Sequence, residues 1–168
     1  MSFKINEKFN EGMIAFAGQD YGTCIDTLTE VVQRDQNHKL AYVSRGAAFM
    51  KTGETKTAMN DFNRAIELDP KYARAHHLRG LAREMEGDDQ GAIGDFTKAI
   101  ELSPEYGAAY HSRATLYTKL GEMDLATEDI QMVTHLTQRN IESYANENNV
   151  WRSNQMHVEA MMETELNR

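Results

Sequence analysis

The chain repeats itself at a fixed interval of 34 residues, and this repetition restricts its fold more than any other feature. The segment DFNRAIELDP, residues 61–70, returns as DFTKAIELSP, residues 95–104, with seven of ten positions unchanged. Further small and apolar positions follow the same interval, which gives four copies at about residues 5–38, 39–72, 73–106 and 107–140. One such unit cannot bury its apolar face alone, so we expect the copies to stack into a single domain spanning residues 1–168.

Each copy is predicted to form two helices joined by a turn. The apolar residues of the second copy fall on two helical faces: Tyr42, Gly46 and Phe49 on the first, and Ala58, Phe62 and Ala65 on the second. Gly53 interrupts the pattern between them, and Pro70 closes the copy, because a proline cannot continue a helix. The pattern therefore predicts an all-α fold.

Glycine recurs at one position of the first helix in three of the four copies, as Gly12, Gly46 and Gly80, and the fourth copy has Ala114 there. A glycine inside a helix costs about 1 kcal/mol relative to alanine, so its recurrence requires a structural reason. We expect a second helix to approach the chain closely at these positions.

These positions together resemble the tetratricopeptide repeat family, whose signature combines aromatic, small, glycine, alanine and proline positions. The second copy matches it throughout, with Tyr42, Gly46, Phe49, Gly53, Ala58, Phe62, Ala65 and Pro70. The third copy has His76 and Arg83 where the family has aromatic residues, and the fourth has Gln138 in place of the proline. The resemblance covers about four fifths of the chain. It implies a right-handed superhelical solenoid of four helix–turn–helix units.

Two charged positions also recur at this interval: Arg45, Arg79 and Arg113 on the first helices, and Asp61, Asp95 and Asp129 on the second. The first copy has Glu11 and Thr27 in these places, so both charges are missing together. We therefore expect an arginine–aspartate pair inside each of the other copies; the alternative is a set of unrelated solvated charges. Such pairs fix register more than they add stability.

The composition argues against several classes of partner. With 26 acidic and 18 basic residues the chain has a net charge of −8, which does not suit nucleic acid or an acidic membrane surface. The N-terminal segment has charged residues where a signal peptide needs an apolar stretch, and no segment is apolar enough to span a membrane. A cytoplasmic location is expected. The single cysteine, Cys24, is expected to be buried as a small apolar residue.

No motif in the sequence suggests catalysis or a bound metal or cofactor. There is no nucleophile–base signature, glycine-rich phosphate loop or closely spaced set of metal ligands. His77 and His111 occupy the same position of successive first helices, but we interpret them as exposed or groove-lining histidines rather than as metal ligands. The chain is therefore predicted not to be an enzyme.

The family resemblance implies a concave surface lined by five positions of each first helix. On this chain these positions hold Asn6, Phe9, Met13, Phe16, Ala17, Leu40, Val43, Ala47, Met50, Lys51, Arg74, His77, Leu81, Glu84, Met85, Ala108, His111, Thr115, Thr118 and Lys119. The lining is apolar towards the N-terminus and mixes cationic and polar groups towards the C-terminus, which suits a peptide or amphipathic helix of another protein. The predicted partner-binding residues are Phe9, Met13, Phe16, Leu40, Val43, Ala47, Met50, Arg74, His77, Leu81 and His111. For Phe9, Met13 and Phe16 the alternative is a place in the core between copies.

Some family members hold the C-terminal carboxylate of a chaperone with lysine, asparagine and arginine side chains at set positions. Here those positions hold Phe9, Met13, Ser44, Arg74 and Leu78. Only Arg74 supplies a comparable charge, so chaperone binding by such a carboxylate clamp is not expected.

The chain continues after the fourth copy, and residues 141–166 are predicted to form a capping helix. Near its end Val158, Met161, Met162 and Leu166 form an apolar stripe, interpreted either as a partly packed tail or as a contact with a second copy or a partner. The leading hypothesis is a non-enzymatic adaptor that binds another protein. The alternative is a self-assembly unit that oligomerises through the C-terminal helix and the groove.

Overall fold

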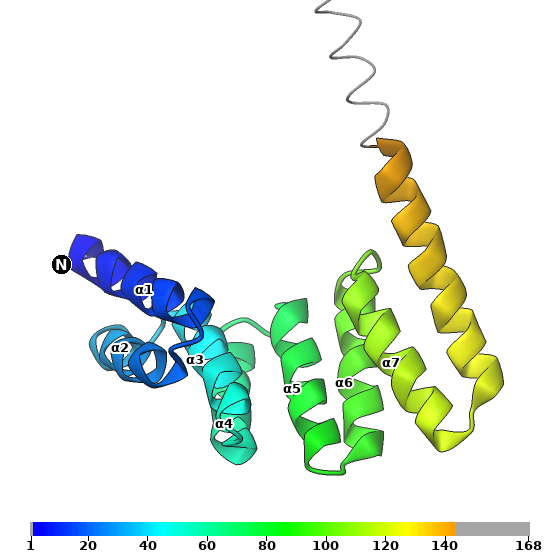
Figure 1. Cartoon of the computed structure of the whole chain (residues 1–168), viewed down its shortest axis with the longest axis horizontal. Coiled ribbons are helices and arrows are strands. Elements are labelled where there is room, and N and C mark those ends of the chain that lie inside the picture. Colours follow the sequence, from blue (N-terminus) through cyan, green and yellow to red (C-terminus); the bar gives the residue numbers. More distant parts are fainter. Residues whose placement is uncertain (1, 144–168) are drawn as a thin grey trace, which may run out of the picture.

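The computed structural model describes residues 2–143, which are α-helical throughout apart from short connections and contain no strand. The helices are α1 (Ser2–Ala17), α2 (Tyr21–Arg34), α3 (Lys39–Lys51), α4 (Thr55–Leu68), α5 (Ala73–Met85), α6 (Asp89–Leu102) and α7 (Gly107–Leu120), followed by helical residues 123–143. From α1 to α7 each helix packs against the next, and the helix pairs follow one another in a row (Figure 1). The predicted all-α solenoid is confirmed.

The turn inside each copy depends on a left-handed backbone conformation. Gly53, Gly87 and Gly121 have φ angles of 84°, 83° and 80°, which glycine adopts without steric cost. In the first copy Gln19 takes this place with a φ of 62°. A residue in the left-handed conformation, glycine in three of the four copies, therefore follows each first helix where the chain reverses into the second.

The glycines inside the first helices lie against large side chains of the second helices, as predicted. The pairs in contact are Gly12 with Leu28, Gly46 with Phe62 and Gly80 with Phe96. A Cβ atom added to Gly80 would lie only 2.6 Å from Cε1 of Phe96, so no larger residue fits without a shift. Leu28, Phe62 and Phe96 are completely buried, and so is Cys24, which confirms its predicted role in packing.

The predicted arginine–aspartate pairs are present in the second, third and fourth copies. Each arginine donates two hydrogen bonds, from Nε and Nη2, to the aspartate of its own copy, with Nη2–Oδ1 distances of 2.7, 2.6 and 2.7 Å for Arg45–Asp61, Arg79–Asp95 and Arg113–Asp129. Burial raises the pKa of Asp61, while the hydrogen bonds from Arg45 act in the opposite direction.

Each of these arginines also reaches the copy before it, which the sequence did not predict. Its Nη1 atom donates to a side-chain oxygen on the preceding second helix: Thr29 at 3.1 Å, Asn63 at 2.9 Å and Thr97 at 2.9 Å for Arg45, Arg79 and Arg113. One guanidinium therefore joins three helices. It fixes both the angle within a copy and the angle between neighbouring copies.

The helix of residues 123–143 continues past the expected end of the fourth copy. The sequence predicts a new helix from residue 141, but the chain is helical without a break from 123 to 143, and the helix extends beyond its neighbours in Figure 1. The physical reason is that Gln138 occupies the place of Pro70 and Pro104, so nothing stops the helix. The rest of the predicted capping helix, with Val158, Met161, Met162 and Leu166, lies outside the described residues.

Candidate functional site

The predicted binding residues of the first copy pack partly into the core. The ring of Phe9 lies 4.8 Å from that of His38, and the ring of Phe16 meets Tyr21 edge to face at 5.5 Å. Both phenylalanines pack against the cluster around Leu28 and are only half-exposed. Met13 is likewise half-buried. These side chains therefore contribute to stability whether or not they meet a partner.

The predicted binding residues of the second and third copies divide into exposed and buried groups. Leu40 is 46% exposed and Arg74 is exposed, whereas Ala47, Met50 and Leu81 are half-buried. Val43 and His77 are buried, and Val43 packs between copies against Ala65 and Ala75. The sequence predicted that all of these side chains line one surface. Spacing along the chain does not show which of them are buried, because burial depends on the angle between neighbouring copies.

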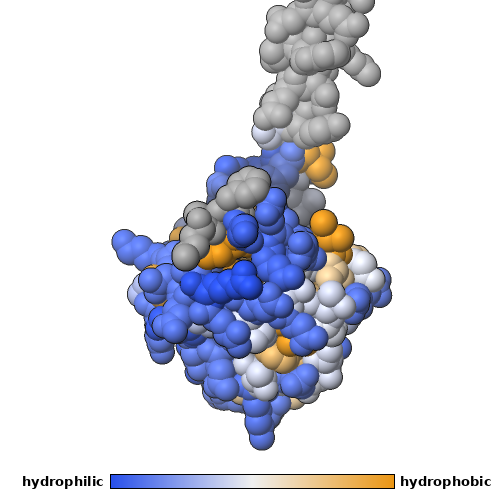
Figure 2. Space-filling view, turned by 90° about the vertical axis from the view of Figure 1, so that its left-hand side faces the viewer, coloured by the Kyte–Doolittle hydropathy of each residue, from blue (hydrophilic) through white to orange (hydrophobic). Residues whose placement is uncertain are grey.

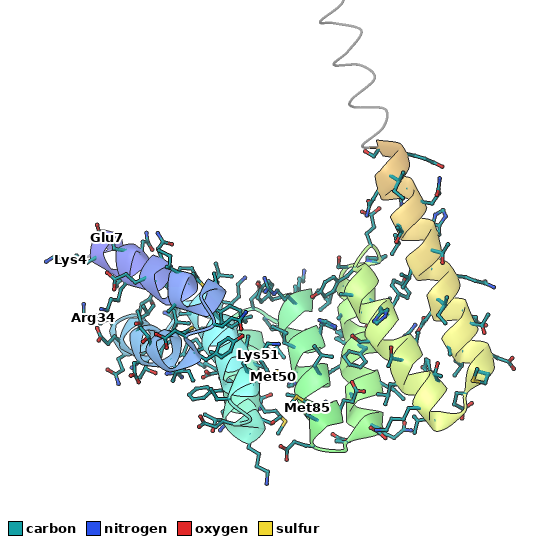
Figure 3. The ribbon with its side chains drawn as sticks, viewed as in Figure 1. Lys4, Glu7, Arg34, Met50, Lys51 and Met85 are labelled. Atoms are coloured by element: carbon teal, nitrogen blue, oxygen red, sulfur yellow. The ribbon has the colours of Figure 1, made fainter. Side chains whose placement is uncertain are left out.

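Two exposed side chains that the sequence did not select extend this surface. Met85, at the end of α5, is 57% exposed, and Lys51 ends α3 with an exposed side chain. Figure 3 shows Met50, Lys51 and Met85 in the middle of the molecule, on α3 and α5. Both missed residues occupy lining positions implied by the family resemblance, so the signal was present in the sequence.

The lining positions differ in charge from the rest of the chain. They contain Lys51, Arg74 and Lys119 but only one acidic residue, Glu84, in a chain whose net charge is −8. Lys119 is paired with Asp89 at 2.8 Å, whereas Lys51 and Arg74 form no ion pair with any residue between 2 and 143. The candidate surface is thus locally cationic on an acidic protein.

His77 joins the third copy to the fourth. Hydrogen bonds connect its Nε2 atom to the hydroxyl of Ser112 at 2.9 Å and its Nδ1 atom to the hydroxyl of Tyr106 at 3.2 Å. Burial, assisted by the charge of Arg74, lowers the pKa of His77 to about 4, so the ring is neutral at pH 7. His111, at the same position of the fourth copy, is exposed. The two histidines are therefore in different environments.

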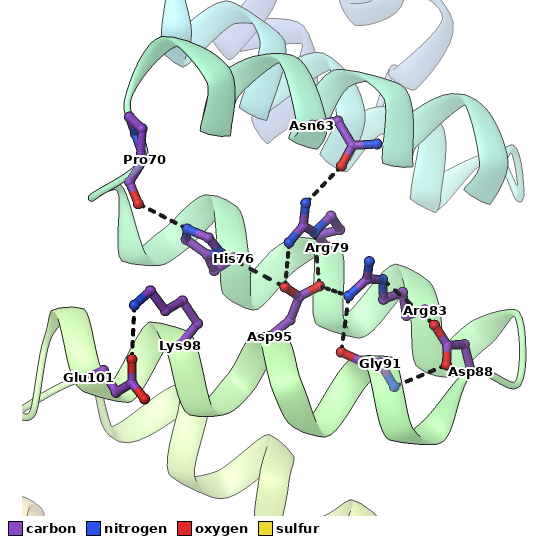
Figure 4. Close-up of polar contacts among 10 residues, drawn as sticks. All are labelled: Asn63, Pro70, His76, Arg79, Arg83, Asp88, Gly91, Asp95, Lys98 and Glu101. Carbon is purple, nitrogen blue, oxygen red and sulfur yellow. Dashed lines mark hydrogen bonds and ion pairs between the residues drawn. The ribbon is translucent and has the colours of Figure 1, made fainter.

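A cluster of charged groups surrounds Asp95 in the third copy (Figure 4). In addition to Arg79, its carboxylate binds Arg83, with Nη1–Oδ2 at 2.9 Å. His76 donates from Nε2 to the carbonyl of Pro70 at 3.1 Å, and its buried Nδ1 atom lies 3.8 Å from Oδ1 of Asp95. His76 and Arg83 were recognised in the sequence as departures from the repeat, but their contact with Asp95 was not foreseen.

Two hollows lie at the edges of the helix pairs. The first, of about 410 Å³, is lined by Gln90, Ile93, Tyr117, Leu120, Glu122 and Leu125. The second, of about 220 Å³, is lined by Tyr72, Ala73, Arg74, Ser103 and Tyr106 and therefore includes one predicted binding residue. The second hollow lies where α5 and α7 begin.

We also searched the described part of the chain for metal sites and membrane-spanning helices. No three His, Cys, Asp or Glu side chains among residues 2–143 are placed to share a metal ion. In the same range, no helix is long and apolar enough to cross a membrane. The end of the molecule nearest α1 and α2, turned to the viewer in Figure 2, is mostly hydrophilic with small, separated apolar areas. The candidate site is the surface along the first helices of the second and third copies, where Leu40, Lys51, Arg74 and Met85 are exposed.

Comparison with known proteins relates the chain to one family. The family model described as TPR repeat matches residues 46–87, and no curated protein sequence matches the chain. The crystal structure of MamA superimposes with a TM-score of 0.76 at 24% identity, covering 82% of this chain and 81% of that one. The Sgt2 TPR domain from Aspergillus fumigatus gives 0.67 at 28% identity, covering 72% and 82%. The first TPR of Spaghetti (RPAP3), solved with an HSP90 peptide, gives 0.69 at 24% identity, covering 72% and 96%. The resemblance seen in the sequence is confirmed.

Proposed function

We propose that this chain, which has a TPR-repeat match at residues 46–87 and the fold of TPR proteins, is a non-enzymatic interaction module. It holds a peptide or amphipathic helix of another protein along its first helices. One observation carries this proposal: an acidic chain places on its first helices exposed apolar side chains and cationic side chains that form no ion pair within residues 2–143. Leu40 and Met85 supply apolar surface, and Lys51 and Arg74 supply charge. Apolar anchors give affinity, while the charges select and orient the partner.

The similarity to the RPAP3 domain supports peptide binding as a use of this fold, since that domain was solved with an HSP90 peptide. The present chain lacks the side chains of a carboxylate clamp, because Phe9, Met13, Ser44 and Leu78 replace them. We therefore propose a different peptide as its partner. The bound segment relies on apolar contacts with Leu40 and Met85 more than on a terminal carboxylate.

The proposed non-enzymatic role fits the way in which four of the buried titratable groups are used. Buried Asp61, Asp95 and Asp129 are each bound to an arginine, and buried His77 is bound to two hydroxyls. A catalytic group needs a free atom near a substrate, and these groups have structural partners instead.

Selection of binders from a displayed random-peptide library tests the proposal. Leu40→Glu combined with Met85→Glu places two charges among the apolar anchors, and we expect it to reduce capture of the selected peptides by about tenfold or more. Ile14→Glu is the matched control, because Ile14 is 73% exposed on α1 outside the lining positions. Equal capture by wild type and the double variant, with circular dichroism unchanged, would place the binding site elsewhere.

Self-association is a second candidate function, and one observation favours it. Ile130 occupies the repeat position of Leu28, Phe62 and Phe96, which are completely buried, yet it is 53% exposed. In the earlier copies residues of the next first helix pack against this position, and in the proposed dimer a second copy of the chain covers Ile130 instead. Sedimentation of the full chain decides the matter: a monomer at every concentration removes this candidate.

A further inference from the structure

The second copy contains an internal ion pair between the start of its first helix and the end of its second. Nζ of Lys39 lies 2.5 Å from Oδ2 of Asp69, and the same ammonium lies 4.4 Å from the centre of the Tyr72 ring. The pair lowers the pKa of Asp69, chiefly through the hydrogen bond from Lys39. The edge of the second copy is therefore filled by its own side chains.

The third copy has the same backbone at this place but lacks the pair. Ala73 stands where the second copy has Lys39, and Ser103 stands where it has Asp69. Two long charged side chains are thus replaced by two short ones, and the hollow of about 220 Å³ opens between Tyr72 and Tyr106. This volume is below that of pockets for drug-sized ligands, and it suits one large side chain.

The charge beside the hollow is positive and unpaired. Arg74 lines it, is exposed, and forms no ion pair with any residue in the range 2–143. The charge of Arg74 acts on two neighbouring groups. It helps burial to lower the pKa of His77, and it partly offsets the increase that burial causes in the pKa of Tyr106. The nearby carboxylate of Glu105 is bound to Arg139 at 3.0 Å. Within residues 2–143 no carboxylate is bound to Arg74, and its exposed side chain is accessible to an external anion.

We propose that this hollow binds an aromatic or aliphatic side chain of a partner peptide, and that a carboxylate next to this side chain in the peptide pairs with Arg74. The inference rests on the proposed function and specifies the partner. The ammonium of Lys39 covers the ring of Tyr72 in the second copy. A partner's cation is disfavoured in the hollow, because Ser103 has no carboxylate to bind it and the charge of Arg74 repels it. The rings of Tyr72 and Tyr106 offer apolar contact, and their planar faces suit an aromatic group.

Hydrocinnamate, which joins a phenyl ring to a carboxylate by a short linker, is a probe for this site. In ¹H–¹⁵N NMR spectra of the full chain, we expect it to shift the amide signals of Ala73, Arg74, Ser103 and Tyr106, with a Kd on the order of 1 mM. Its neutral amide, hydrocinnamamide, is the matched control and should bind about fivefold more weakly, as should the acid to Arg74→Gln. Equal shifts with acid and amide would overturn the assignment.

Restoring the ion pair of the second copy provides a variant that closes the hollow. Ala73→Lys with Ser103→Asp recreates the arrangement of Lys39 and Asp69, so we expect the probe shifts to disappear while the remaining spectrum is preserved. If this double variant does not fold, Ala73→Leu fills the hollow without added charge and should have the same effect. Probe binding that survives in either folded variant would show that the hollow is not the site.

The same library selection separates this inference from the proposed function. In one outcome, the selected peptides lose binding to the Leu40→Glu, Met85→Glu double variant but bind Ala73→Leu as well as wild type. This outcome would contradict binding in the hollow and would leave the proposed function unaffected. In the opposite outcome, the probe binds at Arg74 but the library yields no binding peptide. This outcome would contradict the proposed function and would leave ligand binding in the hollow supported. Peptides that pair an apolar residue with an adjacent acid, and bind at least about fivefold more weakly to Arg74→Gln, support both.

Discussion

The second and third copies share a backbone and one arginine–aspartate pair, but the surroundings of that pair differ. In the second copy the guanidinium of Arg45 lies 5.7 Å from the ring centre of Tyr42 and 5.8 Å from that of Phe49, within the range of a cation–π contact. In the third copy these two places hold His76 and Arg83, and both point to the carboxylate of Asp95. One aspartate therefore binds one arginine in the second copy and two in the third.

The two copies differ again at their surface and interior. Buried Val43 in the second copy corresponds to buried His77 in the third, and the ion pair of Lys39 with Asp69 corresponds to a hollow. Besides the backbone and the arginine–aspartate pair, the copies share the contact of a glycine with a phenylalanine. The comparison teaches that the repeated residues maintain helix packing, while the residues that differ determine local charge, response to pH and access for a partner.

The largest expected effect comes from removing the charge of Asp95. Asp95→Asn leaves Arg79 and Arg83 without their carboxylate, and we expect a loss of about 2–4 kcal/mol in the free energy of unfolding, measured by urea denaturation. Asp61→Asn should cost about half as much, because only Arg45 loses its partner. Asp124→Asn, an exposed change, is the control. Equal losses at Asp95 and Asp61 would mean that Arg83 adds nothing to the third copy.

A smaller effect is expected from acidification, through His77. Its pKa is about 4 in the folded chain and about 6.5 when unfolded, so between these values the unfolded state binds more protons. Stability should therefore fall as pH drops from 6.5 to 4, by up to about 3 kcal/mol from this group, and level off for this group below pH 4.

His77→Val gives the third copy the residue of the second and should flatten the stability profile between pH 6.5 and 4. The slope is the readout, because loss of the hydrogen bonds to Ser112 and Tyr106 lowers stability at every pH. His111→Val is the matched control, since His111 is exposed. An unchanged slope in His77→Val would show that other groups cause the pH dependence.

The smallest expected effect tests what the two copies share. Gly80→Ala brings a Cβ atom within 2.6 Å of Phe96, and overpacking of this kind costs about 1–3 kcal/mol, partly offset by the better helix propensity of alanine. Gly46→Ala should behave alike, because its Cβ atom would lie 2.7 Å from Phe62.

Gly94→Ala is the control for these two changes. Gly94 is exposed on α6 and has no atom within 4 Å of an added Cβ, so alanine should raise the melting temperature there and lower it at Gly80. A rise at Gly80 would mean that the two helices do not need glycine to approach.

Much of the fold was accessible from the sequence because its signals are local and periodic. Phe62 and Gly46, or Arg79 and Asp95, recur at a fixed interval, so a single arrangement has to satisfy every copy. The candidate site was less accessible. Val43 and His77 were predicted to line the groove together with Leu40, but only Leu40 of these three is exposed. Their burial depends on how neighbouring copies pack, which the spacing within one copy does not specify.

The sequence by itself determined the helix pairs, the glycine contacts and the arginine–aspartate pairs, because each follows from a repeated pattern of side-chain size and charge. Only the tertiary structure decided where other side chains of different helices come into contact and where they leave a hollow between them. Arg83 reaches Asp95, His77 bridges two copies, and Ala73 and Ser103 leave a hollow beside Arg74. These features arise from distances of a few ångströms between elements far apart in the chain, and a one-dimensional pattern does not record such distances.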